Sequence, residues 1–96
     1  MRHQSATAHE LARIAELAGV PGERLARLGE RMSREELEPG ASVGAPGTFS
    51  VVLAGMLRGP GGLLRPGDSF DGTATALTPA TVAGCPRADY ESLIAN

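Results

Sequence analysis

In the first part of the chain, apolar residues recur at the spacing of an α-helix. The first set lies between Thr7 and Gly19 and consists of Leu11, Ile14, Ala15, Leu17 and Ala18. Glu10 follows Thr7 by three residues, as in a capping box, and Gly19 is typical of the position just past a helix C-terminus. The pattern predicts one continuous helix that starts near Ser5 or Thr7 and ends before Gly19.

A second apolar stripe at helical spacing follows the turn at residues 20–22 and consists of Leu25, Leu28 and Met32. Pro21 suits the first turn of this second helix, because a first-turn residue needs no amide hydrogen. The opposite face carries arginines interleaved with glutamates, at Arg24, Arg27, Arg31 and Arg34. A solvated, salt-bridged surface is therefore favoured over a basic binding stripe. Residues 1–38 are predicted to form a helical hairpin that packs on the rest of the chain.

From residue 39 onward, short extended segments alternate with Gly and Pro. Residues 35–38 either extend the second helix or form a short edge strand before a Pro-Gly turn, and the strand is favoured. Residues 49–57 form the strongest predicted strand, because Val51 and Val52 are β-branched and their neighbours are apolar. Shorter strands are predicted at 63–64, 69–70, 73–77 and 81–83. The pair Asp71-Gly72 is the strongest short hairpin signal and predicts a tight turn.

The end of the chain, residues 86–96, is predicted to form a closing helix with Leu93 and Ile94 facing inward. The frequent turns favour a small β-roll or jelly-roll over a parallel sheet. The predicted fold class is therefore mainly β with flanking helices. The roll is expected at residues 39–85, between the N-terminal helical hairpin and a short C-terminal helix, in one domain overall.

Charge and composition exclude several classes of function. Nine basic residues, all arginine, stand against 11 acidic ones, which gives a net charge of −2. This balance is unlike the basic surface of a nucleic-acid-binding domain. The single cysteine, Cys85, excludes an internal disulfide and a cysteine-rich zinc site. The sequence has no apolar run long enough to span a bilayer and no apolar signal core, so a cytoplasmic location is expected.

Five segments, in this order, resemble the cyclic nucleotide-binding domain family. They are residues 28–40 (LGERM…LEPG), 49–58 (FSVVLAGMLR), 64–70 (LRPGDSF), 76–82 (ALTPATV) and 87–94 (RADYESLI). The segment 64–70 is similar to the family's leu-x-pro-gly-asp-x-phe turn, and 49–58 to its central strand. The resemblance implies a β-roll with helices at both ends, in agreement with the pattern of strands and turns.

The sequence departs from the family where the family binds its ligand. There, a cassette with a gly-glu pair, a short helix and an arginine follows the phenylalanine of the turn. The resemblance implies that the glutamate would hold the ribose, and that the arginine and helix amides would hold the phosphate. Here only Asp71 and Gly72 separate Phe70 from Thr73, and no arginine lies between residues 65 and 87. The domain is expected to be degenerate, with a hairpin turn in place of the cassette and no affinity for cyclic nucleotides.

Other candidate chemistry is weak. His3 and His9 lack the spacing of a metal site, and Ser50 and Ser69 have no evident His and Asp partners. Cys85 is favoured as a small buried apolar residue over a reactive thiol at a helix start. No catalytic residue, metal site or cofactor is therefore predicted, and the chain is not expected to be an enzyme.

Two functions remain open. The first is a protein-interaction or structural module that docks onto a protein partner or self-associates. Its interface candidates are Leu11, Ile14, Leu17, Leu93 and Ile94. The alternative is a sensor that binds a nucleotide or another small molecule in the mouth of the roll and regulates a partner. Its pocket candidates are Val52, Ala54, Leu64, Phe70, Asp71 and Gly72.

Overall fold

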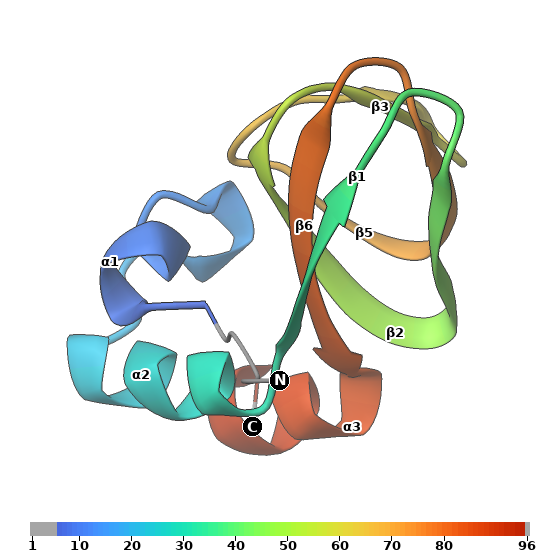
Figure 1. Ribbon diagram of the computed structural model, residues 1–96. Helices are drawn as coiled ribbons and strands as arrows, with labels where there is room; N and C mark the ends of the chain where they lie inside the picture. The colour runs from blue at the N-terminus through green and yellow to red at the C-terminus, as the bar shows by residue number, and fades with distance from the viewer. Residues whose placement is uncertain (1–5, 96) are drawn as a thin grey trace, which may run out of the picture.

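The computed structural model describes residues 6–95, in which short helices from the two ends of the chain lie together on one side of a curved sheet (Figure 1). The N-terminal segments are α1 (Ala8–Leu11), the 3-10 turn η1 (Ala15–Leu17) and α2 (Gly22–Glu30). The chain ends in α3 (Arg87–Tyr90) and the π-helical turn η2 (Glu91–Ala95). None of the helices in the described part is long and apolar enough to cross a membrane.

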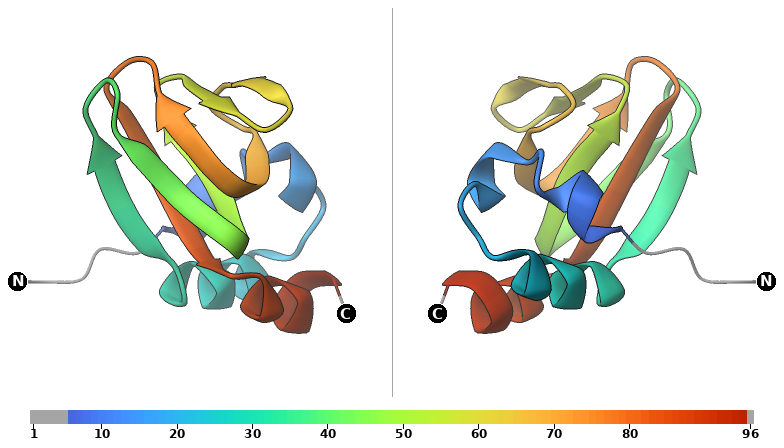
Figure 2. Two further views of the ribbon diagram at one scale, coloured as in Figure 1. Left: turned by 90° about the vertical axis from the view of Figure 1, so that its right-hand side faces the viewer. Right: turned by 90° about the vertical axis from the view of Figure 1, so that its left-hand side faces the viewer.

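The strands are β1 (Ser33–Leu37), β2 (Ser42–Ala54), β3 (Leu57–Gly59), β4 (Gly62–Leu64), β5 (Ser69–Ala76) and β6 (Ala80–Pro86). They form one sheet in the order β1-β6-β2-β5-β3-β4, and all neighbours are antiparallel. Figure 2 shows how strongly this sheet curves and that the helices gather on one side of it. The predicted fold class, a mainly β roll with flanking helices, is confirmed.

Two long strands each serve both layers of the roll. Residues 49–51 of β2 pair with 69–71 of β5, whereas residues 42–45 of β2 pair with 72–75 of β5. The later half of β2 also pairs with β6, while the later half of β5 lies beside β3. One layer therefore contains β1, β6 and the later half of β2. The other contains β3, β4, the first half of β2 and the later half of β5.

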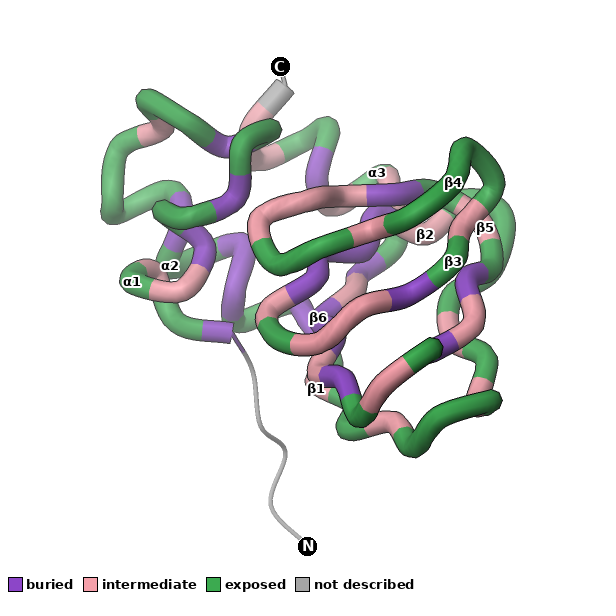
Figure 3. The backbone as a smooth tube through the Cα atoms, turned by 90° about the horizontal axis from the view of Figure 1, so that it is seen from above, coloured by how far each residue is buried: buried purple, intermediate pink, exposed green. Residues whose placement is uncertain are grey.

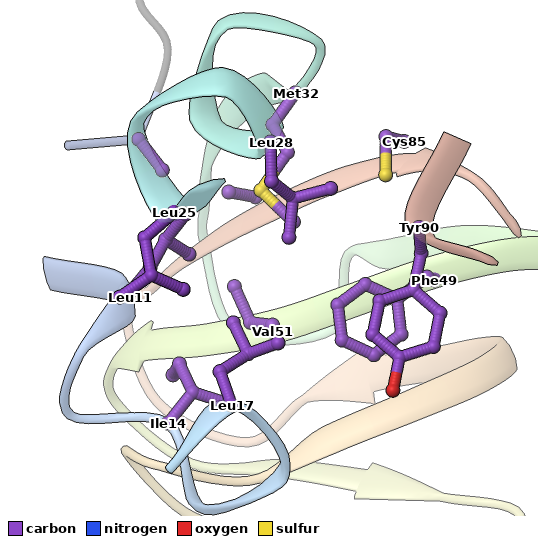
Figure 4. Packing of buried hydrophobic residues seen from close by; sticks show 12 residues of the cluster. Leu11, Ile14, Leu17, Leu25, Leu28, Met32, Phe49, Val51, Cys85 and Tyr90 are labelled. Carbon is purple, nitrogen blue, oxygen red and sulfur yellow. The ribbon is translucent and has the colours of Figure 1, made fainter. Parts of the chain in front are cut away.

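Alternating side chains of β2 enter two different hydrophobic clusters, as the period of a strand requires. Phe49 and Val51 pack against the helices, and Val52 packs between the two layers. The helix-side cluster also contains buried residues from the helical segments, as Figure 4 shows: Leu11, Ile14, Leu17, Leu25, Leu28, Met32 and Tyr90. The interlayer cluster consists of Val52, Leu57, Phe70, Ala74, Ala76, Ala80 and Val82.

The prediction of one continuous first helix is wrong. Its start agrees with the capping box of Thr7 and Glu10, and Ser5 lies outside the described residues. Gly19 has the positive φ of 83° that is expected after a helix. Between them the helix breaks at Ile14, whose backbone is extended. The break frees the amide of Ala15 to donate a hydrogen bond of 2.9 Å to the Gly67 carbonyl. A tertiary contact with the turn at residues 65–68 therefore overrides the helical pattern.

The strongest predicted strand exists but has different bounds. β2 begins at Ser42 rather than residue 49, and it ends at Ala54 rather than 57. It ends there because Gly55 has a φ of 83° and passes close to the chain at Pro79. The predicted edge strand at 35–38 is confirmed as β1 at the edge of the sheet, although it begins two residues earlier and ends one residue earlier than predicted.

The predicted hairpin turn at Asp71-Gly72 is wrong, because β5 runs without interruption through both residues. Gly72 does have a positive φ, 96°, as the Asp-Gly signal requires. The sheet uses it to carry β5 from one layer to the other. The extra residues lie in the facing strand, where the register shifts between Ala45 and Phe49, and the Gly47 amide donates to Asp71 Oδ1 at 3.3 Å.

The C-terminal helix docks through an aromatic stack. The Tyr90 ring lies 4.0 Å from the Phe49 ring between centroids, with 15° between the planes. Leu93 and Ile94 are half-buried and pack against the same helix-side cluster. The prediction that these two residues face inward is therefore confirmed.

An ion pair joins the N-terminal segment to the edge of the sheet. Arg34 of β1 donates two hydrogen bonds to the Glu10 carboxylate, at 2.8 and 2.9 Å. This pairing holds the pKa of Glu10 below its usual value. Because the folded pKa is lowered, the stabilisation is complete above the ordinary glutamate pKa and is lost as the pH falls through the folded value.

We therefore expect Glu10→Gln to lower the free energy of unfolding by about 1 kcal/mol at pH 7, since both side chains remain partly exposed. The gap between variant and parent should close as the pH falls below about 4. Urea titrations across this pH range measure it. Glu23→Gln, at an exposed glutamate of α2, is the control and should follow the parent. A gap that persists unchanged at low pH would contradict the assignment.

Candidate functional site

The resemblance places a ligand at the junction of the two layers, and here Asp71 occupies that position. Its carboxylate accepts the hydrogen bond from Gly47 and lies 3.8 Å from the Arg87 guanidinium. Arg87 itself lies over the Tyr90 ring at 5.3 Å and 3.4 Å from Glu91. The junction thus carries a carboxylate, and the cation beside it already has two acidic neighbours.

Of the predicted pocket residues, only Val52 lines either of the two cavities described below. Val52 and Phe70 are buried in the interlayer cluster and Leu64 packs against it, whereas Ala54 is exposed. Asp71 is exposed and Gly72 is half-buried.

The strands β2 and β5 approach each other closely at the junction. A Cβ on Gly44 would lie 2.3 Å from the Gly72 carbonyl oxygen. The side chains of Val52 and Phe70 occupy the space between the layers at this point.

Three of the predicted interface residues are not on the surface. Leu11, Ile14 and Leu17 are at most 1% exposed and pack within the helix-side cluster. The expectation that they form a contact surface is corrected by this burial, because the chain's own sheet covers them. The same apolar spacing that indicated an interface is what seats the helices on Phe49 and Val51.

A cavity of about 320 Å³ lies between the N-terminal segment and the turn at residues 65–68. Its lining residues are Glu10, Arg13, Ile14, Val52, Leu53, Pro66 and Gly67. The cavity exists because Ala15 bonds to Gly67, which holds the turn beside the break in the helix. Among its lining residues only Val52 was a predicted pocket residue, since neither segment alone indicates the other.

A second pocket, of about 180 Å³, opens at the mouth of the roll between the two layers. We call it the mouth pocket, and its lining residues are Ser33, Glu35, Val43, Gly44, Thr48, Ser50, Val82 and Gly84. None of them was a predicted pocket residue. The signal that points to it is Ser50, a polar side chain at an otherwise apolar stretch of β2 that is only 1% exposed.

Cys85 lies in the helix-side cluster, 3% exposed, so the interpretation as a buried apolar residue is confirmed. Burial, with the Asp89 carboxylate nearby, raises the pKa of its thiol to about 11. His9 is exposed, and His3 lies outside the described residues. The part of the chain that the structure describes contains no group of three or more His, Cys, Asp or Glu placed to hold a metal ion.

We expect Cys85 to react with a thiol reagent such as DTNB at pH 8 at least about a hundredfold more slowly in the folded protein than in urea, because the thiolate is the reactive form. Absorbance of the released thiol follows the reaction. Cys85→Ser, which has no thiol, sets the background. Equal rates in the folded and unfolded protein would show that the thiol is accessible and ionised.

The sequence matches no protein-family model and no curated protein. Solved structures are nevertheless similar in fold. A regulatory subunit of a cAMP-independent protein kinase A from Trypanosoma cruzi, bound to guanosine, has a TM-score of 0.72 at 19% identity. The regulatory domain of Toxoplasma gondii PKA with cAMP has a TM-score of 0.70 at 18% identity. The matches cover 91% of this chain but only 40% and 43% of those chains.

The N-terminal domain of a transcriptional regulator from Streptomyces coelicolor A3(2) is also similar, with a TM-score of 0.66 at 21% identity. That match covers 90% of this chain and 79% of the other. The chain therefore has the fold of cyclic nucleotide-binding domains, as the resemblance in its sequence implied.

Proposed function

We propose that this chain is a non-catalytic regulatory module that acts by binding a protein partner, or a second copy of itself, and that it does not bind cyclic nucleotides. The observation that carries the proposal is the uninterrupted course of β5 through Asp71 and Gly72. A phosphate-binding cassette would have to leave the sheet at this point. The fold is kept, while the element that the family uses for its ligand has no place in the chain.

The charges at the junction support the same proposal. A bound phosphate needs cationic or amide donors, and here it would meet the Asp71 carboxylate instead. The nearest cation, Arg87, belongs to α3 and lies 3.8 Å from that carboxylate. A cyclic nucleotide would therefore have to displace an existing ion pair and approach a negative charge.

Isothermal titration calorimetry with cyclic AMP and cyclic GMP tests the first half of the proposal. We expect no binding heat with either nucleotide at about millimolar concentration. The cAMP-bound regulatory domain from Toxoplasma gondii is a suitable positive control, because it shares the fold and its structure holds the nucleotide. Micromolar binding to this chain would overturn the proposal.

The second half concerns the partner. Size-exclusion chromatography with light scattering distinguishes a self-associating chain from a monomer that needs another protein. This role implies a cytoplasmic location and no direct contact with membrane or nucleic acid. A net charge of −2 gives the chain no electrostatic attraction to nucleic acid or to an anionic membrane surface.

A small-molecule sensor is the second candidate, and the cavity between the N-terminal segment and the 65–68 turn favours it. Its volume of about 320 Å³ falls at the lower end of the range for ligand pockets. Leu53 gives it an apolar wall, and Arg13 gives it a cation beside the Glu10 carboxylate, which Arg34 already binds. An NMR screen of small carboxylates that shifts the Gly67 amide would favour this function over the first.

A further inference from the structure

The mouth pocket is lined by both polar and apolar residues. β1 contributes Ser33 and Glu35, and β2 contributes Thr48 and Ser50. Val43 and Val82 form apolar walls opposite these oxygen atoms. A pocket of about 180 Å³ is too small for a nucleotide but has room for one long side chain. Hydroxyl and carboxylate oxygens beside apolar walls suit a cationic head on an apolar stem.

Ser50 indicates that the pocket is built to hold a polar group. The residue is 1% exposed, and its hydroxyl makes no hydrogen bond to any other side chain of the described residues. The hydroxyl oxygen is not sealed in the core but opens beside Gly84, where a Cβ would lie 3.0 Å from it. A donor that entered the pocket could therefore reach this hydroxyl oxygen as an acceptor.

The carboxylate of Glu35, which lines the pocket, is uncompensated. It makes no ion pair within the described part of the chain, and neither does Glu38 in the turn that follows. Glu36 points to the other face of the strand, where it interacts electrostatically with Arg34. The one arginine of β1, Arg34, is bound by Glu10 on the helix side of the strand. This edge of the roll is therefore acidic, and it complements a basic partner.

The pocket also lies next to an open strand edge. β1 is the terminal strand of the sheet and pairs only with β6. Figure 2 shows β1 at the margin of the sheet with no described segment along its outer side. An extended peptide can add to such an edge through main-chain hydrogen bonds, and its alternate side chains then enter neighbouring pockets.

We propose that the mouth pocket binds an arginine or lysine side chain of an extended basic segment of a partner protein, and that this segment adds to β1 as a further strand. The inference rests on the proposed function, because it names the chemistry of the partner. The cation lies between Glu35 and the hydroxyl of Ser50, and its apolar stem packs on Val43 and Val82. Main-chain pairing supplies affinity, and the pocket supplies the selectivity for a basic side chain.

A second copy of this chain fits the edge less well. If two β1 strands paired antiparallel about their centre, Glu35 would face the Glu35 of its partner. Like charges directly opposite each other destabilise a strand pair. The other edge of the sheet, β4, has only three residues and is mostly exposed (Figure 3).

The test uses two short blocked peptides, one that alternates threonine with arginine and one that alternates threonine with glutamate. Each is titrated into the ¹⁵N-labelled protein at low salt. We expect only the arginine peptide to bind, with the largest shifts at the amides of β1 and at Gly84. Glu35→Gln should weaken binding about tenfold, because it removes the charge that meets the cation. Glu23→Gln, on α2, should leave it unchanged.

A second variant fills the pocket without touching its charge. Gly84→Ala places a Cβ 3.0 Å from Ser50 Oγ and 3.4 Å from Thr48 Cγ2, so it should also reduce binding. Equal binding of the two peptides, no binding of either, or binding that ignores Glu35→Gln would overturn the inference. Such a result leaves the nucleotide calorimetry untouched, so the failure of this inference is distinguishable from failure of the proposed function.

Discussion

Replacing Phe49 with alanine is expected to lower the free energy of unfolding by about 3–5 kcal/mol. Phe49 is 2% exposed and lies at the centre of the helix-side cluster. Its ring stacks on Tyr90 and so joins β2 to α3. The variant therefore loses both a large buried side chain and the aromatic contact that docks the C-terminal helix.

Urea unfolding followed by circular dichroism measures this loss. A domain of this size has a total stability of about 5–15 kcal/mol, so Phe49→Ala can unfold completely. Phe49→Leu keeps most of the volume and should lose about 1–2 kcal/mol, which keeps the test measurable. Leu63→Ala is the surface control, because Leu63 is 49% exposed, and it should stay within about 0.5 kcal/mol of the parent. A similar small loss for both Phe49 variants would show that the stack contributes little.

Replacing Gly55 with alanine has the second largest expected effect, about 2–5 kcal/mol of lost stability. Two costs add at this position. The φ of 83° is unfavourable for any residue with a Cβ. That Cβ would also lie 2.3 Å from the Pro79 carbonyl oxygen and 2.6 Å from the Ala80 Cα. Both are backbone atoms, so the turn between β5 and β6 would have to move away from the end of β2.

Gly19→Ala separates these two costs. Gly19 has the same φ of 83°, but a Cβ there would meet no atom within 4 Å. Its substitution should therefore lose only the conformational part, about 1–2 kcal/mol. The difference between the two variants in urea titrations reports the crowding at Gly55. Equal losses would mean that the Pro79 turn yields freely and that the contact does not fix the course of the chain.

Local chemistry in the sequence predicted much of the roll. The turn at residues 65–68 forms as its Pro, Gly and Asp residues indicate, with the Asp68 carboxylate accepting the Arg65 amide at 2.8 Å. The edge strand at 33–37 and the helical C-terminus also follow the expected pattern. These features depend on residues within a few positions of one another, and for that reason they are visible in a sequence.

The candidate sites were predicted less well, because they depend on residues far apart in the chain. Leu11, Ile14 and Leu17 were assigned to an interface since their spacing shows an apolar face but not what covers it. The mouth pocket brings together residues of β1, β2 and β6, and its clearest signal was the single buried polar residue Ser50. The short connection between Phe70 and Thr73 was visible in the sequence, because the number of residues between two positions needs no tertiary information.

By itself, the sequence determined the class of fold, the capped start of the first helix, and the lack of a segment between Phe70 and Thr73. Only the tertiary structure decided what Asp71-Gly72 does. The pair has the positive φ of a hairpin turn, yet β5 continues through it, since β2 supplies pairing partners on both sides of the bend. The same holds at Ile14, where the bond from Ala15 to Gly67 breaks the helix. A local preference worth about 1 kcal/mol yields wherever strand pairing and burial across the chain contribute more.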